Sequence, residues 1–305
     1  MVFSNKSEKL EINSNGSIAT VRDYFELLKP RVMSLAIFTA IIGLLLAPNN
    51  IHPFLAIFSI IAIGAGAGAA GAINMWYDKD IDKVMDRTKS RPVPSGRVKS
   101  EEALTLGIVL SIFSILLLFV ASNYIAASFL FLSIIFYIFI YTIWLKRITT
   151  QNIVIGGAAG ALPPIIGWFA VSQEFSMLPV LLFMIIFFWT PPHFWALSLY
   201  RSDDYQRAGI PMLPVVKGKK VTRINILLYS ISLIFVCPSP WYLGYLGNIY
   251  GVLTTLFTIV FIYFSWNVYK EKLGSEPVLF KYSILYLFLL FLIMPIDKYF
   301  YIWIN

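Results

Sequence analysis

Long apolar runs separated by short polar segments dominate this chain of 305 residues. Most of the runs reach or approach the roughly 20 residues that an α-helix needs to cross a bilayer. This pattern predicts an all-α fold, a polytopic membrane helix bundle of about nine transmembrane helices. The runs lie near residues 32–47, 54–75, 103–121, 124–145, 153–171, 177–199, 223–246, 249–269 and 279–296.

Prolines and small residues refine this picture. Pro238 and Pro240 fall inside the seventh run, which predicts a kink or break there. Pro191 and Pro192 predict a break in the sixth run for the same reason. Small-residue stretches at 64–72 and 156–164 favour close packing of helix backbones.

The chain divides into a polar tail, residues 1–29, and a membrane domain, residues 30–305. The tail carries several acidic residues, which argues against a transit peptide, and it shows no signal-peptide pattern. We therefore expect the first apolar run to be a retained helix.

Composition supports the membrane assignment and its orientation. With 58% hydrophobic and 13% charged residues, the chain lies outside the range of soluble proteins. All of the 24 lysines and arginines except Lys298 fall in the tail, in the loops after even-numbered runs, or beside those loops. The positive-inside rule then predicts a cytoplasmic N-terminus and a C-terminus on the outer side.

The net charge of +8 fits a membrane face beside anionic headgroups of the lipid bilayer. No soluble module is present to carry that charge to a nucleic acid, so we expect no nucleic-acid partner. The one cysteine, Cys237, excludes an intramolecular disulfide and a cysteine-based metal cluster.

The segment NMWYDKDIDKVMDRTKSRPVPSGR, residues 74–97, follows the second run and holds four aspartates. Asn74, Asp78 and Asp82 are four residues apart, so a helix aligns them in one stripe, with Asp80 on the far side. Carboxylates on one face repel each other unless a cation lies between them, and oxygen ligands suit Mg²⁺.

Arginines follow this stripe at once, at Arg87 and Arg91. A carboxylate-bound Mg²⁺ beside arginine side chains is a common arrangement for binding a polyphosphate. The alternative is a solvated loop of mixed charge.

A second acidic cluster ends the sixth run. Tyr200, Arg201, Asp203 and Asp204 lie there, and this run is also even-numbered. Both clusters therefore belong on the same membrane face, where they could hold a metal–diphosphate between them.

Two further sites each allow two interpretations. Lys146 and Arg147 end the fourth run, either as a diphosphate clamp or as an anchor in the headgroups. His193, one of two histidines, lies within the sixth run, either as a buried, hydrogen-bonded histidine or as a functional ionisable group inside a membrane span. His52 lies in a short outer loop, and we expect no role for it.

Together these motifs resemble the UbiA superfamily of membrane prenyltransferases. The resemblance rests on N-x-x-x-D-x-x-x-D after the second run, Lys-Arg after the fourth and Y-x-x-D-D after the sixth. Within it, residues 74–97 and PPHFWALSLYRSDDYQRAGIPMLPVV, residues 191–216, are similar to the protoheme IX farnesyltransferases. The resemblance covers about residues 24–295.

The resemblance implies a UbiA-like fold and transfer of a farnesyl group from farnesyl diphosphate to a vinyl group of haem B. The allylic C–O bond ionises, the vinyl group attacks the cation, and water captures the new cation as a hydroxyl. The products are haem O and diphosphate. This step in haem O and haem A synthesis for terminal oxidases implies a bacterial inner-membrane location, with haem A synthase or a second copy of the chain as further partners.

The resemblance also implies residue roles. The Mg²⁺ ligands would be Asn74, Asp78, Asp82, Asp203 and Asp204, with Tyr200 as a further catalytic residue. Cations at the diphosphate would be Arg87, Arg91, Lys146, Arg147 and Arg201. His193 would contact haem.

Three other functions remain open from the residues. A UbiA-type enzyme that prenylates a quinone precursor would share the diphosphate machinery, but the long second segment disfavours it. A CDP-alcohol phosphotransferase needs a D-G-x-x-A-R element, which this sequence lacks. A transporter or channel would place polar residues through the midplane, whereas here they concentrate at one face.

Overall fold

The computed structural model describes residues 19–304, and within that range every regular element is helical. Eight helices in this range are long and apolar enough to cross a membrane, and a bent pair raises the number to nine. The predicted helix bundle of about nine spans is confirmed. Of the predicted tail, residues 1–18 lie outside the described residues.

The first half of the chain builds one set of spans. Its elements are α1 (Val21–Leu27), α2 (Pro30–Leu46), α3 (Pro53–Tyr77), α4 (Lys79–Val84), α5 (Ser100–Ala121), α6 (Tyr124–Ile135), the π-helix η1 (Phe136–Leu145) and α7 (Lys146–Ile148). The helices α1 and α2 form the bent pair, with an angle of 57° between them.

The second half continues with further spans. Its elements are α8 (Asn152–Ala161), α9 (Pro163–Val171), α10 (Met177–Tyr200), α11 (Ser202–Arg207), α12 (Leu213–Val216), α13 (Gly218–Val236), α14 (Ser239–Tyr242), α15 (Asn248–Tyr269) and α16 (Ser275–Ile304).

The structure confirms the predicted effect of proline in the seventh span and differs from the prediction in the fifth and sixth spans. The seventh span is broken between α13 and α14, next to Pro238, as predicted. The fifth span, predicted as continuous, is interrupted at Leu162 before Pro163 and Pro164.

The predicted break at Pro191 and Pro192 was wrong, because α10 runs through both prolines. Membrane helices tolerate proline where neighbouring helices and hydroxyl side chains stabilise the backbone. Here α10 packs against α8, α13 and α16. The hydroxyl of Thr190 also donates to the carbonyl of Ile186 at 2.7 Å.

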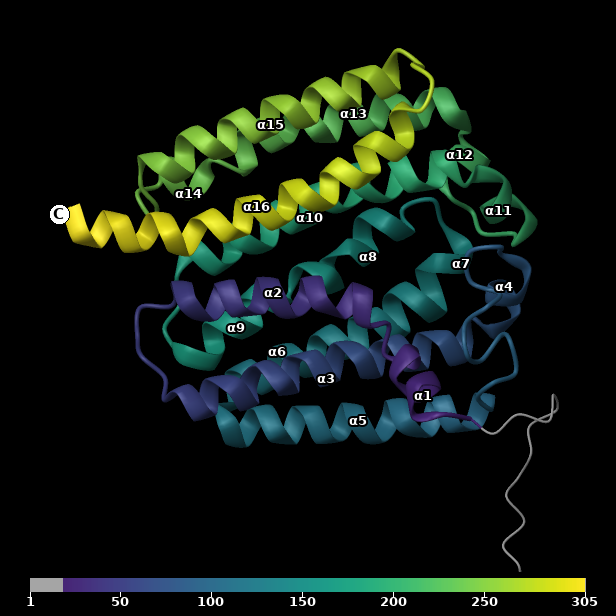
Figure 1. Ribbon diagram of the computed structural model, residues 1–305, viewed down its shortest axis with the longest axis horizontal. Coiled ribbons are helices and arrows are strands. Elements are labelled where there is room, and N and C mark those ends of the chain that lie inside the picture. The colour runs from purple at the N-terminus through teal and green to yellow at the C-terminus, as the bar shows by residue number, and fades with distance from the viewer. Residues whose placement is uncertain (1–18, 305) are drawn as a thin grey trace, which may run out of the picture.

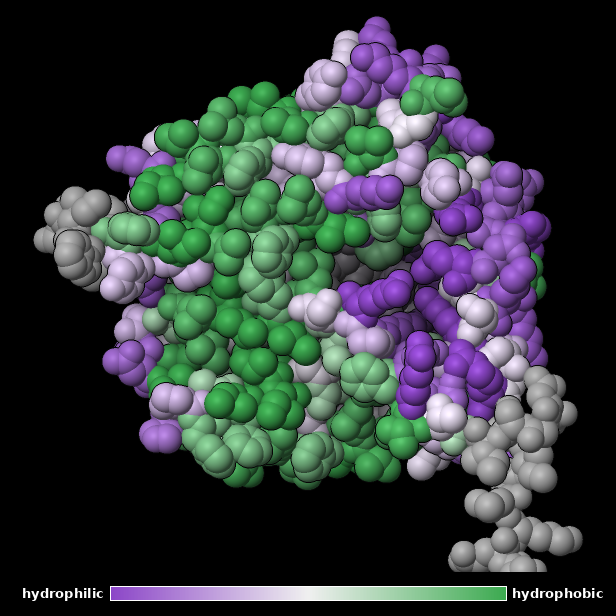
Figure 2. Space-filling model, in the orientation of Figure 1, coloured by the Kyte–Doolittle hydropathy of each residue, from purple (hydrophilic) through white to green (hydrophobic). Residues whose placement is uncertain are grey.

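The long helices lie side by side, and the short elements α4, α7, α11 and α12 gather at one end of the bundle (Figure 1). We call this the charged end. Hydrophilic residues cover it, whereas the middle of the visible face is hydrophobic (Figure 2). This distribution is that of an integral membrane protein whose polar machinery lies at one end of the spans.

Close backbone contact joins α2 to α9, toward the end of the bundle opposite the charged end (Figure 1). A Cβ atom on Gly43 would lie 2.1 Å from the carbonyl oxygen of Pro164. A Cβ atom on Gly167 would lie 2.0 Å from the carbonyl oxygen of Ala40. Neither backbone can move aside without separating the two helices, so both positions require glycine.

This packing predicts that Gly167→Ala destabilises the protein by about 1–3 kcal/mol, the usual cost of overpacking. The measurement is the thermal unfolding midpoint of the detergent-solubilised protein. Gly160→Ala is the matched control, because its added Cβ atom would meet nothing within 4 Å. Equal midpoints for the two variants would contradict the close contact.

Candidate active site

The first acidic stripe forms as the spacing predicts. Helical hydrogen bonds continue across the junction of α3 and α4, from Asp78 N to Asn74 O at 2.9 Å and from Asp82 N to Asp78 O at 2.8 Å. Asn74, Asp78 and Asp82 are all buried, with at most 3% of each residue exposed. The side-chain amide of Asn74 donates to Asp78 Oδ2 at 2.8 Å.

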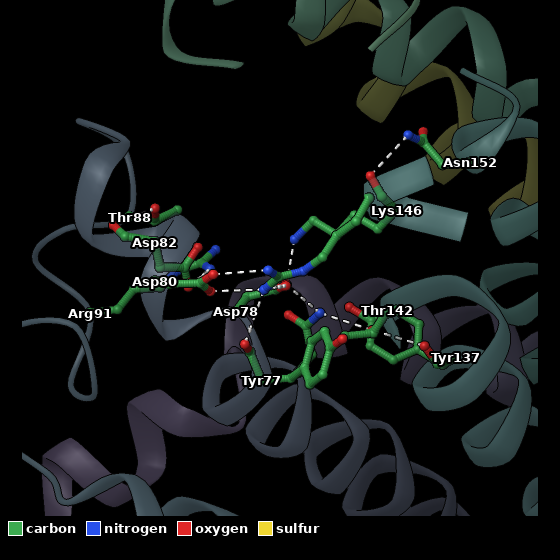
Figure 3. A network of polar contacts seen from close by, with 12 residues as sticks. Tyr77, Asp78, Asp80, Asp82, Thr88, Arg91, Tyr137, Thr142, Lys146 and Asn152 are labelled. Atoms are coloured by element: carbon green, nitrogen blue, oxygen red, sulfur yellow. Dashed lines mark hydrogen bonds and ion pairs between the residues drawn. The ribbon is translucent and has the colours of Figure 1, made fainter. Parts of the chain in front are cut away.

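Cations from other elements meet this stripe (Figure 3). Lys146 at the start of α7 donates to Oδ2 of Asp78. Arg91, in the loop after α4, donates to Oδ2 of Asp82 at 2.7 Å. Buried carboxylates are stable only when paired in this way.

Asp80 lies on the exposed side of α4, away from the buried stripe as the spacing predicts, but Arg147 links it to the cluster. Its carboxylate accepts two hydrogen bonds from Arg147, both at 2.8 Å. Arg147 also lies 3.7 Å from Oδ1 of Asp78. The hydrogen bonds from Arg147 lower the pKa of Asp80 to about 2. The Asp80 side chain is nevertheless 61% exposed, unlike those of the stripe.

A π-helix orients the partner of Asn74. In η1 the hydroxyl of Thr142 donates to the carbonyl of Tyr137 at 2.8 Å, five residues earlier. The same hydroxyl accepts from the amide of Asn74 at 3.0 Å. Because π-helical turns are rare and occur often at functional sites, this element supports the assignment of the site.

The second acidic cluster lies against the first, as the shared face predicted. Arg207 of α11 donates to Asp204 and, at 2.5 Å, to Asp86 in the loop after α4. A small apolar cluster joins the two segments beneath this contact, with Ile81 and Tyr205 among its members. The structure therefore brings Asp78, Asp82 and Asp204 to one end of the bundle.

Other predicted residues lie outside this cluster. Asp203 is exposed, and among the described residues its carboxylate accepts a hydrogen bond from Ser202 alone, at 3.2 Å. Tyr200 is 55% exposed, and its ring lies under the Arg201 guanidinium. Arg87 is exposed at the same end and makes no ion pair among the described residues. Roles for these four at the diphosphate stay predictions.

Lys29 is a site residue that the sequence reasoning missed. It precedes α2 with φ 53° and ψ 59°, a left-handed conformation that is costly for a residue with a side chain. Its ammonium group donates to Oδ1 of Asn74. A lysine directly before Pro30, at the start of the first apolar run, was the available signal.

An apolar pocket begins at Lys29 and runs between α2, α3, η1 and the α8–α9 segment. It encloses about 690 Å³ of empty space, part of it open to the surroundings. Small residues such as Gly66, Ala67 and Gly160 line it, and Tyr137 lies along it. The polar cluster therefore lies at the Lys29 end of the apolar pocket.

The fit of a divalent cation rests on two carboxylate oxygens. Among the described residues no three acidic, histidine or cysteine side chains come close enough to form a metal site alone. However, Asp78 Oδ1 and Asp204 Oδ2 are buried and accept no hydrogen bond from any described residue. Mg²⁺ typically uses one or two carboxylates and completes its shell with phosphate oxygens and water. These residues fit that mode of binding, in which the substrate supplies the remaining ligands.

His193 lies on α10, buried between α10 and α16. Its Nδ1 contacts Ser283 Oγ at 2.6 Å. Its ring packs nearly parallel to those of Trp189 and Phe280. The structure thus gives His193 the hydrogen bond expected of a buried histidine and leaves its role at haem a prediction.

Comparisons with known proteins identify the family. The profile of the UbiA prenyltransferase family matches residues 36–294. A protoheme IX farnesyltransferase of Afipia carboxidovorans is 54% identical over 92% of this chain and 91% of its own. One from Rhodopseudomonas palustris strain BisB18 is 56% identical over the same shares.

Solved structures share the fold. A digeranylgeranylglyceryl phosphate synthase superimposes with a TM-score of 0.74 at 21% identity, covering 90% of this chain and 98% of its own. A UbiA homolog from Archaeoglobus fulgidus, bound to DMAPP and Mg²⁺, gives 0.65 at 14% identity, covering 87% and 99%. By sequence and by fold, the chain belongs to the UbiA prenyltransferase family, and within it to the protoheme IX farnesyltransferases.

Proposed function

We propose that this protein transfers the farnesyl group of farnesyl diphosphate to a vinyl group of haem B and releases diphosphate. The product is haem O, which carries a hydroxyethylfarnesyl side chain. The observation that carries the proposal is the carboxylate–cation cluster at the head of an apolar pocket, with Lys29 belonging to both. An isoprenoid diphosphate has the same two parts, a polyanionic head and an apolar chain.

The diphosphate would bind between the two acidic segments. Asp78 and Asp204 would hold Mg²⁺ through the carboxylate oxygens that accept no hydrogen bond from the described residues, and the metal would neutralise charge on the diphosphate. Asn74 and Asp82 flank Asp78 on the same stripe. Asp203 is placed less favourably, because it faces outward.

Fixed cations would then assist departure of the leaving group. Lys29 and Lys146 already point at this stripe, and Arg91 and Arg147 stand beside them. Charge builds up on the diphosphate as the allylic C–O bond ionises. Cations held in place before the reaction therefore stabilise the transition state more than the ground state.

The farnesyl chain would occupy the apolar pocket below Lys29. The pocket is lined mainly by aliphatic and small side chains. These side chains need no hydrogen-bond partner, so an apolar farnesyl chain can pack against them. The hydroxyl-bearing ring of Tyr137 lies along the wall and could face the allylic cation. Haem B would approach from the side of α10, where His193 lies.

The reaction itself is the first test. Membranes that contain this protein, given haem B, farnesyl diphosphate and Mg²⁺, should accumulate haem O, detected by chromatography and mass. EDTA should stop the reaction, because diphosphate departure then lacks part of its counter-charge, and added Mg²⁺ should restore it. Prenylation of a quinone precursor with haem B left unchanged would refute the proposed acceptor.

The acidic stripe gives a graded prediction. Asp78→Asn and Asp82→Asn should each lower the turnover number by about 100-fold or more, since each removes a charge from the buried site. Asp80→Asn should stay within about tenfold, because its ion pair with Arg147 is largely exposed. Size-exclusion profiles confirm that each variant is folded. An Asp80→Asn loss as large as that of Asp78→Asn would refute the ranking.

We also propose that the charged end faces the cytoplasm of a bacterial inner membrane, with the C-terminus on the outer side. The support is the distribution of lysine and arginine along the sequence, in the tail and beside the loops after even-numbered spans, together with the hydrophilic surface at that end (Figure 2). Association with a haem A synthase or with a second copy of the chain is a further prediction. Copurification of the tagged protein with haem A synthase or with an untagged copy of the chain would support this association. Purification of the tagged protein as a monomer without either partner would contradict it.

Orientation can be read from cysteine labelling in intact cells. A cysteine at Lys272, exposed in the α15–α16 loop at the charged end, should resist a membrane-impermeant thiol reagent until the cells are opened. A cysteine at Asn50, exposed in the loop between α2 and α3, should react at once. Cys237 is buried and adds little background. The reverse labelling pattern would overturn the orientation.

A further inference from the structure

The contact between His193 and Ser283 fixes a histidine deep in the bundle. His193 Nδ1 and Ser283 Oγ are 2.6 Å apart, across the interface of α10 and α16. The indole N–H of Trp189 donates to the carbonyl of Ser283 at 2.9 Å. The centroid of the His193 ring lies 4.3 Å from that of Trp189 and 4.8 Å from that of Phe280. These contacts leave the imidazole little freedom to turn.

The protons in this contact can be assigned by counting. Ser283 Oγ also lies 2.6 Å from the carbonyl oxygen of Phe280, three residues earlier in α16. A carbonyl only accepts, so the single hydroxyl proton of Ser283 is directed there. With the hydroxyl proton of Ser283 on that carbonyl, Nδ1 supplies the proton in the short contact with His193. On this geometry we assign to His193 the Nδ1–H tautomer, with an unprotonated Nε2.

The surroundings favour a neutral ring. No carboxylate is among the described contacts of His193, and a charged imidazolium is costly in apolar surroundings without a counter-ion. Nε2 makes no hydrogen bond to any residue in the described range, and the residue keeps 8% of its surface exposed. A bare imidazole nitrogen is thus the chemical group that this site presents.

We propose that Ser283 is a positioning residue that holds His193 in the tautomer able to ligate the haem iron through Nε2. This inference rests on the proposed function, since haem B is the substrate there. Histidines that ligate metals generally donate their other ring N–H to a fixed acceptor, which sets the tautomer and the ring orientation. A haem propionate only accepts hydrogen bonds, so it does not match an unprotonated Nε2.

The test is a titration of the purified, detergent-solubilised protein with haem B, followed by absorption and resonance Raman spectroscopy. The wild-type protein should give the spectrum of an imidazole-ligated haem. His193→Ala should lose that spectrum and regain it with added imidazole. Ser283→Ala should bind haem about 10–100-fold more weakly, the usual effect of losing such a partner, and shift the iron–histidine stretching frequency. Ser283→Thr, which keeps a hydroxyl, should restore both.

Ser198→Ala is the matched control. Ser198 is a fully buried serine of α10 whose hydroxyl also donates to a carbonyl three residues earlier, that of Trp195 at 3.0 Å. This variant should bind haem as the wild type does. Binding of farnesyl diphosphate, measured in every variant, should stay unchanged, which separates loss of haem contact from loss of fold.

The outcomes separate the inference from the function on which it rests. If Ser283→Ala keeps the wild-type affinity and stretching frequency, the inference is overturned while the proposed function stands. If His193→Ala keeps the wild-type spectrum, His193 is not the ligand and the inference is overturned as well. If the wild-type protein binds no haem but prenylates another acceptor, both the inference and the proposed acceptor are overturned.

Discussion

The pairing of buried carboxylates with lysine and arginine side chains is the constraint on which this structure depends. Asp78, Asp82 and Asp204 have at most 5% of their surface exposed, and each accepts a hydrogen bond from a lysine or arginine on another segment or turn. Removing one partner from a buried ion pair typically costs about 3–5 kcal/mol. The lysine and arginine side chains of this cluster are therefore held in place before any substrate arrives.

Several uncommon backbone features serve this pairing. The left-handed turn at Lys29 bends α1 away from α2 and brings an ammonium group to Asn74. The π-helical register of η1 places Thr142 against the same asparagine. Strained or rare backbone geometry persists only where the surrounding contacts determine it, and it often marks a functional site. Both features converge on Asn74.

The sequence predicted the parts of the site that depend on spacing and hydropathy. The separation of four residues predicted that Asn74, Asp78 and Asp82 lie in one stripe. The charge distribution predicted that both acidic clusters lie at one end. It could not say which aspartate of the pair at 203 and 204 faces inward. That choice depends on α11, a helix of six residues that starts after an irregular turn at Arg201.

Two other misses came from tertiary contacts. Pro191 and Pro192 predict a break, yet α10 continues through both prolines where it packs against three helices. Asp80 lies on the exposed side of α4, as periodicity requires, but Arg147 reaches it from another segment. Such contacts join residues far apart in sequence, and neither periodicity nor composition records them.

The location of the metal and the diphosphate tests the account most directly. The measurement is the structure of the protein with a non-hydrolysable farnesyl diphosphate analogue and Mn²⁺ in place of Mg²⁺, with Mn²⁺ located by its anomalous scattering. We expect a peak within bonding distance of Asp78 Oδ1, with the diphosphate contacting Lys29 and Lys146. A peak beside Asp203 at the exposed surface, or a diphosphate bound away from these lysines, would contradict it.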